Sequence, residues 1–317
     1  MLWGATNSTQ LLAGMANRNV WFIIFLSPML FWFWDPLVAV FALSLKHGQY
    51  SHIILMPFLS LYILYLERKA VFTRVEWSLW PGLILTVGGG ALFASTGVST
   101  VDKVDILTLA ILSMVTMCWG AFLLVYGSIA FRKAFFGLSL LLFMVPFPTL
   151  LLEATIGFLQ RGSTEGVDIL FGLLGVPVYR QGFVFVLPNL TIQVAEECSG
   201  IRSSLALLIS SLVAGHFFLR SSWTRMTLVL LVVPLTIVKN AIRIVVLSLL
   251  GNYVHPSFIT DSVLHHYGGI PLFFVTLAVL GAFVWLLQRA EAELPSLVIR
   301  RGLMQARATR GAPGCPN

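Results

Sequence analysis

Long apolar runs separated by short polar stretches repeat along the chain. A run of about 20 apolar residues is long enough to cross a hydrocarbon core of about 30 Å as a helix. The chain contains eight candidate runs, of which the second is the shortest, at residues 20–43, 52–66, 79–96, 106–127, 135–152, 200–219, 226–250 and 270–288. Kinks are expected where prolines interrupt the first and fifth runs, at Pro28, Asp35–Pro36, Pro146 and Pro148.

The longest stretch between these runs, residues 150–199, follows a different pattern. Its first part, ATIGFLQRGSTEGVDILFGLLG, has apolar residues at helical spacing with charged residues between them, which predicts a helix in the membrane interface. Its second part, FVFVLPNLTIQVA, predicts two short strands around Pro188–Asn189. The pattern therefore indicates an all-α polytopic membrane protein with about eight transmembrane helices, an interfacial helix and a short β-hairpin.

Composition agrees with this fold class. Hydrophobic residues make up 58% of the 317 residues, charged residues make up 10%, and the mean hydropathy is +0.90. A chain this apolar is not a soluble globular protein. The net charge of +7 does not indicate a nucleic-acid partner, because the basic residues occur in small clusters between the apolar runs.

These clusters predict which side each loop faces, because loops rich in Lys and Arg stay in the cytoplasm. In a topology of eight spans, 13 of the 20 basic residues fall on one side: Arg18, Arg68, Lys69, Arg74, Arg132, Lys133, Arg220, Arg225, Arg289, Arg300, Arg301, Arg307 and Arg310. The other side holds only Lys46, Lys103, Arg161 and Arg180. Both termini are therefore expected in the cytoplasm, with residues 150–199 outside, so the interfacial helix and the hairpin are extracytoplasmic.

Three regions follow from this topology. Residues 1–19 are a cytoplasmic N-terminus, residues 20–288 are a single transmembrane domain, and residues 289–317 are a basic cytoplasmic tail that we expect to be disordered and to lie against acidic membrane lipid.

The residues whose side chains could take part in a reaction lie toward the extracytoplasmic side of this topology. Cys198, within VAEECSGIRSS, directly precedes the sixth run, and His265 and His266 precede the eighth. Arg243 lies in the seventh run, eight residues before Gly251, which places it roughly 12 Å below the outer end at about 1.5 Å per residue. Its long side chain can reach upward from there.

Taken singly, most of these residues have an ordinary explanation. Buried cysteines are mostly small packing residues, as we expect for Cys118 in the fourth run, and Cys315 lies in the Pro/Gly tail. Adjacent histidines in a loop are more often solvated than catalytic. Arg243 differs, because a charge within a span costs about 2.5 to 3.5 kcal/mol and by default marks function. A thiol, an imidazole and a cation together are what acyl transfer to a thiol requires.

Each residue then has a role in amide cleavage through a thioester. His265 is the base that takes the proton of the Cys198 thiol and returns it to the leaving amine. Arg243 holds the thiolate or the oxyanion, and Asn240, one turn earlier, could orient it. Lys239 lies on the same face and could merely be paired within the bundle. No cofactor and no metal ion are needed.

At these residues the chain resembles the exosortases and the related archaeosortases. The stretches that carry the resemblance are YSHIILMPFLSLYIL at 50–64, with Ile53 where glycine is usual, FMVPFP at 143–148, LLGVPVYRQG at 173–182, VAEECSGIRS at 194–203, NAIRIV at 240–245 and HHYGG at 265–269. The spacing to Gly269 favours His265 as the family's histidine and leaves His266 as the alternative. The resemblance covers about residues 20–288.

The resemblance also implies an activity, a location and a class of substrate, which composition does not indicate. Exosortases are transpeptidase-like cysteine enzymes of the bacterial inner membrane. Their substrates are exported proteins with a C-terminal sorting signal, formed by a Pro-Glu-Pro type motif, a transmembrane helix and a basic tail, and the family often accompanies exopolysaccharide production. Arg202 could then meet the acidic residue of the motif, or it could pair with Glu196 or Glu197. The predicted hairpin could bind the motif by strand addition or only cover the site.

Two other classes of function remain open. In a transporter, Arg243, Lys239 and the histidines would line a polar pathway, and charges would be spread through the membrane depth. In this topology they lie toward one end of the spans, which disfavours a transporter. In a non-catalytic component of exopolysaccharide export, the Cys198 thiol would be incidental.

Overall fold

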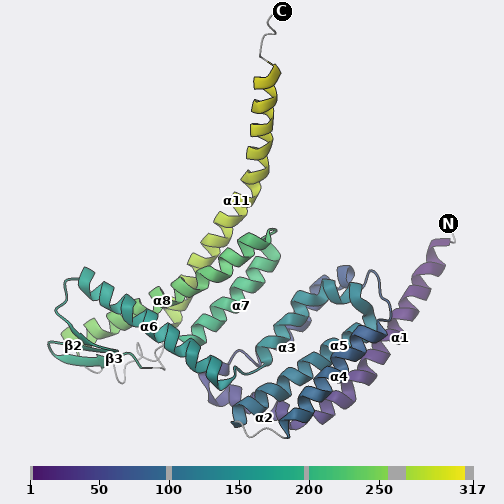
Figure 1. Cartoon of the computed structure of the whole chain (residues 1–317), viewed down its shortest axis with the longest axis horizontal. Coiled ribbons are helices and arrows are strands. Elements are labelled where there is room, and N and C mark those ends of the chain that lie inside the picture. The colour runs from purple at the N-terminus through teal and green to yellow at the C-terminus, as the bar shows by residue number, and fades with distance from the viewer. Residues whose placement is uncertain (1–2, 98–101, 196–199, 256–268, 311–317) are drawn as a thin grey trace, which may run out of the picture. The chain divides into compact units, whose positions relative to one another are not determined.

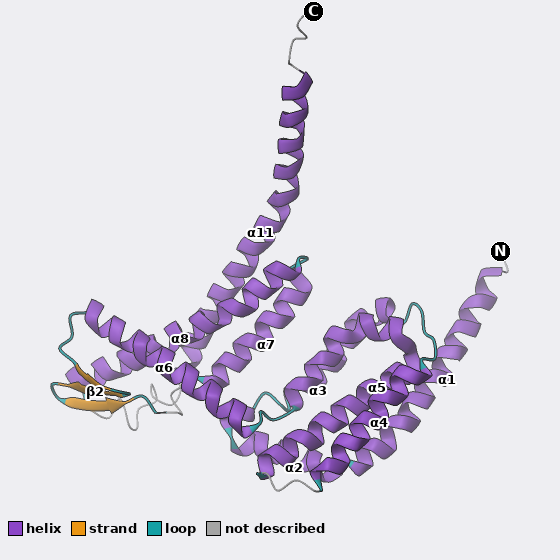
Figure 2. Cartoon of the chain, viewed as in Figure 1, coloured by secondary structure: helices purple, strands orange, loops and turns teal. Residues whose placement is uncertain are grey.

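The structure is a computed structural model that describes residues 3–97, 102–195, 200–255 and 269–310 (Figure 1). Helices form nearly all of it, with one small sheet (Figure 2). The chain divides into two compact units, Met1–Ala154 and Thr155–Asn317. The predicted all-α polytopic fold is confirmed.

The first unit contains helices only. They are α1 (Trp3–Trp32), α2 (Trp34–Lys46), the 3₁₀ turn η1 (Gly48–Tyr50), α3 (Leu55–Val71), α4 (Leu79–Thr96), α5 (Lys103–Ser139) and the 3₁₀ turn η2 (Leu140–Met144). The central element is α5, which contacts each of the four α-helices before it. Its buried residues form an apolar core with aromatic side chains from α1 and from the segment that follows α3.

Helix α6 (Thr149–Leu173) contains the boundary between the units. The second unit continues with strands β1 (Tyr179–Gln181), β2 (Val184–Leu187) and β3 (Leu190–Gln193), and with helices α7 (Ile201–Phe218), α8 (Ser222–Tyr253) and α11 (Gly269–Arg310). α11 runs past residue 288, where the last span was expected to end.

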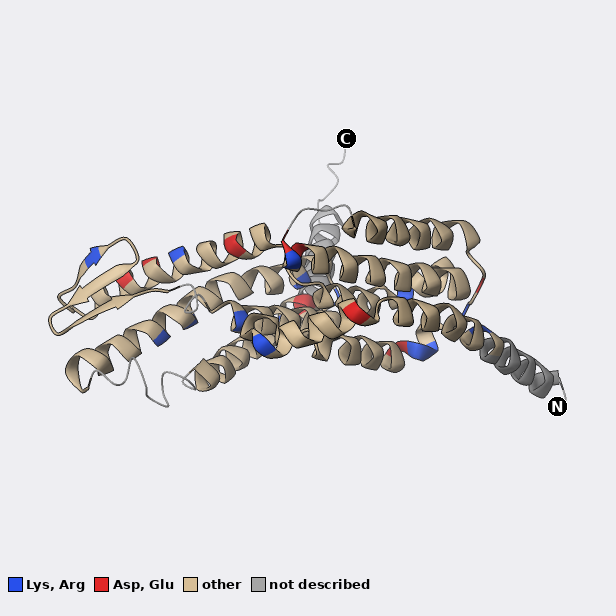
Figure 3. Ribbon diagram, turned by 90° about the horizontal axis from the view of Figure 1, so that it is seen from below, with Lys and Arg blue, Asp and Glu red and all other residues tan. Residues whose placement is uncertain are grey.

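Six helical segments of the described chain are long and apolar enough to cross a membrane, or seven if the bent pair α1 and α2 forms one span. Long parts of these helices carry no charged residue (Figure 3). The bent pair has an angle of 69° between residues 17–32 and 34–46, and the break lies next to Asp35–Pro36. A kink was predicted there, and Pro36 explains it, because a proline fits the first turn of a new helix but not the interior of a continuing one.

Gly127 breaks α5 sharply. Its backbone has φ +85° and ψ 173°, a conformation that is essentially restricted to glycine. A Cβ atom at this position would also lie 2.5 Å from the carbonyl oxygen of Glu76, so a neighbouring segment occupies the space of a side chain. Gly127 is therefore required both by the backbone conformation and by the close approach.

The two parts of α5 fold back on each other at Gly127. The indole N–H of Trp119 donates to the carbonyl oxygen of Leu138 at 3.1 Å, and the Thr108 hydroxyl donates to that of Pro146 at 3.1 Å. In a straight helix, residues 19 positions apart would be separated by roughly 28 Å. The segment is therefore a helical hairpin, whose two arms correspond to the predicted fourth and fifth spans.

The second arm ends earlier than expected, so the predicted boundary at residue 152 is wrong. Helical structure stops at Met144, and α6 begins at Thr149, where the Asp105 carboxylate accepts hydrogen bonds from the Thr149 N–H at 2.8 Å and hydroxyl at 3.1 Å. The prolines at 146 and 148 break the helix here, because a proline disfavours helical backbone at the residue before it.

Three of the basic segments meet at one end of the first unit. The Arg18 guanidinium donates to the carbonyl oxygen of Val125 at 2.6 Å, and the Lys133 ammonium donates to that of Ala70 at 3.0 Å. The positive-inside rule requires these segments to share one side of the membrane, and their contacts satisfy this requirement. That this side is the cytoplasm stays a prediction.

Residues 149–195 contain the predicted helix and hairpin. α6 is not among the candidate membrane spans. β2 and β3 pair antiparallel with Leu187 opposite Leu190, which confirms the hairpin. β1 was not predicted; it pairs antiparallel with β2 and makes the sheet three-stranded.

We expect that replacing Gly127 by alanine destabilises the protein, because a Cβ would force both a disfavoured backbone and a clash with Glu76. Such strain costs about 1 to 3 kcal/mol, so the midpoint of heat-induced unfolding in detergent should fall. Gly90→Ala is the control, because Gly90 lies in α4 with open space around it and has no positive φ. Equal midpoints for the two variants would contradict the hairpin turn.

Candidate active site

Three polar residues share one face in the middle of α8. Lys239 and Arg243 are four residues apart, and Asn240 and Arg243 are three apart, so their side chains lie on the same side of the helix. Lys239 is 7% exposed and Asn240 is 1% exposed. Burying polar groups in the middle of an apolar helix costs free energy unless other segments provide hydrogen-bond or charge partners.

The first turn of α7 is one of these segments. Gly200 has φ +76° and caps the helix, and its carbonyl oxygen accepts from the N–H groups of Ser203 at 3.1 Å and Ser204 at 3.0 Å. A Cβ at Gly200 would lie 3.3 Å from Oδ1 of Asn240, so the two segments are in close contact. The Lys239 ammonium donates to the Ser203 hydroxyl oxygen. The start of α7 is therefore attached to the polar face of α8.

The first residue of α11 also lies against this face. A Cβ at Gly269 would lie 3.9 Å from Cζ and 3.9 Å from Nε of Arg243. The Arg243 guanidinium therefore packs against the beginning of α11, at the residue that closes the HHYGG motif.

Helix α6 supports the same face from another direction. The Asn240 side-chain amide donates to the Ser163 hydroxyl at 2.9 Å, and the Gln160 amide donates to the carbonyl oxygen of Val194 at 2.6 Å. Ser163 and Gln160 are three residues apart on α6, and both are buried. One face of α6 thus holds both α8 and the chain that leaves β3 toward Cys198.

An apolar core fixes the sheet in this arrangement. Val167 and Phe171 of α6, Phe185 of β2 and Val245 of α8 are all buried in a single cluster. The rings of Phe171 and Phe185 meet edge to face at 5.8 Å. At the hairpin turn, the backbone N–H of Asn189 donates to Oδ1 of Asn252 in α8 at 3.0 Å. β1 and β3 are the edge strands of the sheet.

A surface ion pair attaches β1 to α6. The Arg180 guanidinium lies 2.5 Å from a Glu165 carboxylate oxygen and 3.0 Å from an Asp168 oxygen. Its hydrogen bond lowers the pKa of the Glu165 carboxyl below the usual value of 4.5, and the same bond raises the pKa of Arg180. Because the pair is exposed to solvent, it contributes little to stability.

The structure places the predicted site residues as follows. Asn240, Arg243 and Lys239 come together with described residues of the VAEECSGIRS and HHYGG motifs, namely Gly200, Ser203 and Gly269. Arg202 lies in the first turn of α7 with its side chain exposed. The remaining predicted residues, Cys198, His265, His266, Glu196 and Glu197, lie outside the described residues.

Three further residues of this region, Gln160, Ser163 and Ser203, are not indicated by the sequence. Their signal was weak, because neutral polar residues are frequent on helix surfaces and their sequence positions do not indicate a partner. The three-residue spacing of Gln160 and Ser163 was the available signal. Among the described residues, no group of three or more His, Cys, Asp or Glu side chains is arranged to hold a metal ion.

We expect the stabilisation from the Arg180–Glu165 pair to depend on pH in one direction. Since its pKa is lowered in the folded protein, the Glu165 carboxylate stabilises the fold above pH 4.5, and this contribution is lost as the pH falls through the lowered pKa. The unfolding midpoint of Glu165→Gln should therefore lie slightly below that of the wild type at neutral pH and meet it in acid. Glu153→Gln, on the same helix and exposed, should show no such dependence. A constant difference at all pH values would contradict this assignment.

The family of transmembrane exosortases matches residues 43–282. No curated protein matches the chain, and no solved structure matches it.

Proposed function

The chain belongs to the transmembrane exosortase family, and we propose that it is a membrane-embedded cysteine peptidase or transpeptidase that acts through a thioester on Cys198. Its substrates are exported proteins with a C-terminal sorting signal, made of a Pro-Glu-Pro type motif, a transmembrane helix and a basic tail. The observation that carries the proposal is that two glycines, one from the thiol motif VAEECSGIRS and one from the histidine motif HHYGG, pack against Asn240 and Arg243. These are Gly200 and Gly269.

Chain length supports the placement of the thiol. Cys198 precedes Gly200 by two residues, and an extended chain spans at most about 3.6 Å per residue, so the Cys198 Cα lies within about 7 Å of the Gly200 Cα. By the same rule, His265 lies within about 14 Å of Gly269. Both motifs are thus tied to the two glycines that touch the polar face of α8.

The proposed reaction gives a role to each of these groups. His265 takes the proton of the Cys198 thiol, and the thiolate attacks the carbonyl carbon of the scissile amide. The Arg243 guanidinium stabilises the oxyanion that develops on the carbonyl oxygen. When the C–N bond breaks, the histidine returns its proton to the leaving amine and a thioester remains. Water or a second amine then releases the acyl group and regenerates the thiol.

The N-terminus of α7 assists the thiolate. Cys198 precedes Ile201, the first residue of α7, by three residues. The positive end of a helix dipole and nearby cations lower the pKa of a thiol, which increases the thiolate fraction near neutral pH. Glu196 and Glu197 act in the opposite direction, so a strong cation is needed.

Lys239 is a positioning residue in this proposal. It is buried in α8 and donates to Ser203 in the first turn of α7, so it holds the segment that follows Cys198 against Arg243. It also adds a second positive charge one turn from Arg243. Lys239 and Arg243 thus both have a role in the proposal: Lys239 positions the first turn of α7, and Arg243 contacts the reacting atoms.

The proposed location is the bacterial inner membrane, with both termini in the cytoplasm and the active site on the periplasmic side. A sorting signal crosses the membrane as a helix with its basic tail in the cytoplasm, so its cleavable motif would reach the outer face. The family's association with exopolysaccharide makes the export machinery a proposed partner, alongside membrane lipid.

Cys198→Ala and Cys198→Ser should each lower processing of a co-expressed protein with such a signal by at least about a thousandfold, because the nucleophile is lost. Processing is measured by the size shift of the substrate. Cys118→Ala is the matched control, since Cys118 is a free thiol within α5, in the other unit. Normal processing by both Cys198 variants would exclude the enzyme and favour a transporter or a non-catalytic export component.

The two histidines can be separated by single substitutions. His265→Ala should abolish processing, whereas His266→Ala should retain most of it. Loss in His266→Ala alone would reassign the base, and normal processing in both variants would remove the histidine from the mechanism.

Lys239→Met, which removes the charge at similar length, should lower processing about tenfold or more, the scale expected for losing a hydrogen bond to a charged group. It should also move the pH midpoint of Cys198 alkylation upward, because a cation that favours the thiolate is gone. Val238→Met, on the exposed face of α8, is the control. A lower unfolding midpoint with an unchanged alkylation profile would show that Lys239 is only structural and would contradict its positioning role.

A further inference from the structure

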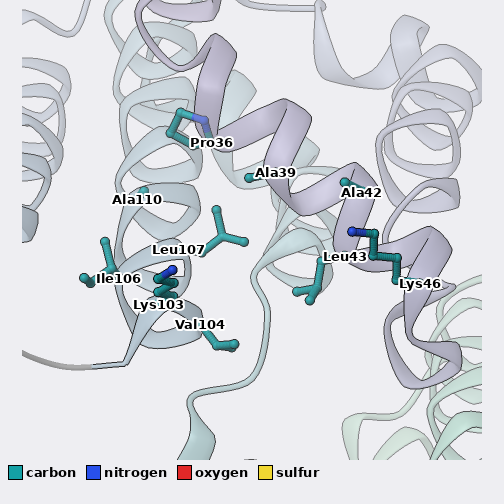
Figure 4. Close-up of a pocket in the computed structure, with 10 residues that line it drawn as sticks. All are labelled: Pro36, Ala39, Ala42, Leu43, Lys46, Lys103, Val104, Ile106, Leu107 and Ala110. Atoms are coloured by element: carbon teal, nitrogen blue, oxygen red, sulfur yellow. The ribbon is translucent and has the colours of Figure 1, made fainter.

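A groove between α2 and α5 in the first unit has no role in the proposed reaction. It has a volume of about 380 Å³, within the range of about 300 to 1,000 Å³ typical of small-molecule sites. Apolar side chains line most of it, and two lysines complete the lining: Pro36, Ala39, Ala42, Leu43, Lys46, Lys103, Val104, Ile106, Leu107 and Ala110 (Figure 4). The groove is thus an apolar channel with a basic end.

The two lysines lie where their helices end. Lys46 is the last residue of α2, and Lys103 is the first residue of α5. They come from opposite walls of the groove (Figure 4). Both side chains are exposed, and within the described part of the chain neither makes a hydrogen bond or an ion pair. Their charges are therefore available to a ligand.

The length of the groove matches one leaflet of a bilayer. From Lys46 to Pro36 the lining of α2 covers ten residues, or roughly 15 Å at about 1.5 Å per residue, and the hydrocarbon core of one leaflet is also about 15 Å thick. A ligand with its charge at the lysines would place its apolar part alongside Ala42, Ala39 and Pro36. An acyl chain has this shape and polarity.

We propose that this groove is a binding site for an anionic phospholipid, with one acyl chain between α2 and α5 and the phosphate between Lys46 and Lys103. The nearby acidic groups are compatible with this charge pattern. The Asp105 carboxylate is occupied by the backbone N–H and hydroxyl of Thr149. Asp102, next to Lys103 and exposed, opposes an anion and weakens the site without cancelling two lysines.

The site is tested on the whole protein, reconstituted in bilayers of phosphatidylglycerol and phosphatidylcholine with identical acyl chains. The lipids that remain bound after extraction into detergent are counted by native mass spectrometry. The wild type should retain more phosphatidylglycerol than phosphatidylcholine. A lysine near an anionic headgroup contributes about fivefold in affinity at low salt, so Lys46→Gln and Lys103→Gln should each lower the preference by about that factor. Asp102→Asn should increase the preference for phosphatidylglycerol, because it removes a negative charge next to Lys103.

Two controls separate the groove from general surface charge. Lys69→Gln combined with Arg74→Gln removes the charge of two exposed basic residues, one in the last turn of α3 and one just after it, and it should leave the preference unchanged. Ala42→Phe fills the groove and should reduce retention of both lipids, whereas Val38→Phe, on the exposed side of α2 and outside the lining, should not. An unchanged preference in the double Lys46→Gln, Lys103→Gln variant, or unchanged retention in Ala42→Phe, would overturn the proposal.

Discussion

The architecture of the second unit depends on one constraint, which is the cost of burying the polar groups Lys239, Asn240 and Arg243 within an apolar helix. A charge at such a depth costs a few kcal/mol unless other groups solvate it. In this protein three segments contact these residues: the start of α7, the start of α11 and one face of α6. The segments that carry the thiol and histidine motifs are attached to α7 and α11, so the requirement for partners and the assembly of the proposed site have the same physical origin.

Much of this arrangement was predictable because it follows from burial. Apolar runs had to become helices, and a cation such as Arg243 within a run had to find partners, so contacts between this face of α8 and the starts of α7 and α11 could be anticipated from sequence. β1 was missed, because Tyr179–Gln181 is too short to show alternation and is a strand only through its pairing with β2. Gln160 and Ser163 were missed for a similar reason, since their partners lie far away in the sequence.

The first unit shows how local backbone chemistry sets topology. The sequence indicates two spans where the structure has one long helical segment, and Gly127 reconciles the two descriptions, because its left-handed backbone folds the segment into a hairpin. That fold brings the basic residues Arg18 and Lys133 to a common end, as the positive-inside rule requires. The prolines after Met144 then end the second arm earlier than hydropathy alone would place it.

The central claim is that the thiol and histidine motifs are neighbours over Arg243, and proximity cross-linking tests it most directly. In a Cys118→Ser, Cys315→Ser background, Cys198 would be joined by a short bifunctional thiol reagent to a cysteine introduced by His266→Cys or, as a control, by Trp223→Cys. Trp223 lies 20 residues before Arg243 on α8, roughly 30 Å away. Efficient cross-linking to position 266 and none to position 223 is the predicted result. Cross-linking at position 266 no faster than at position 223 would contradict the account.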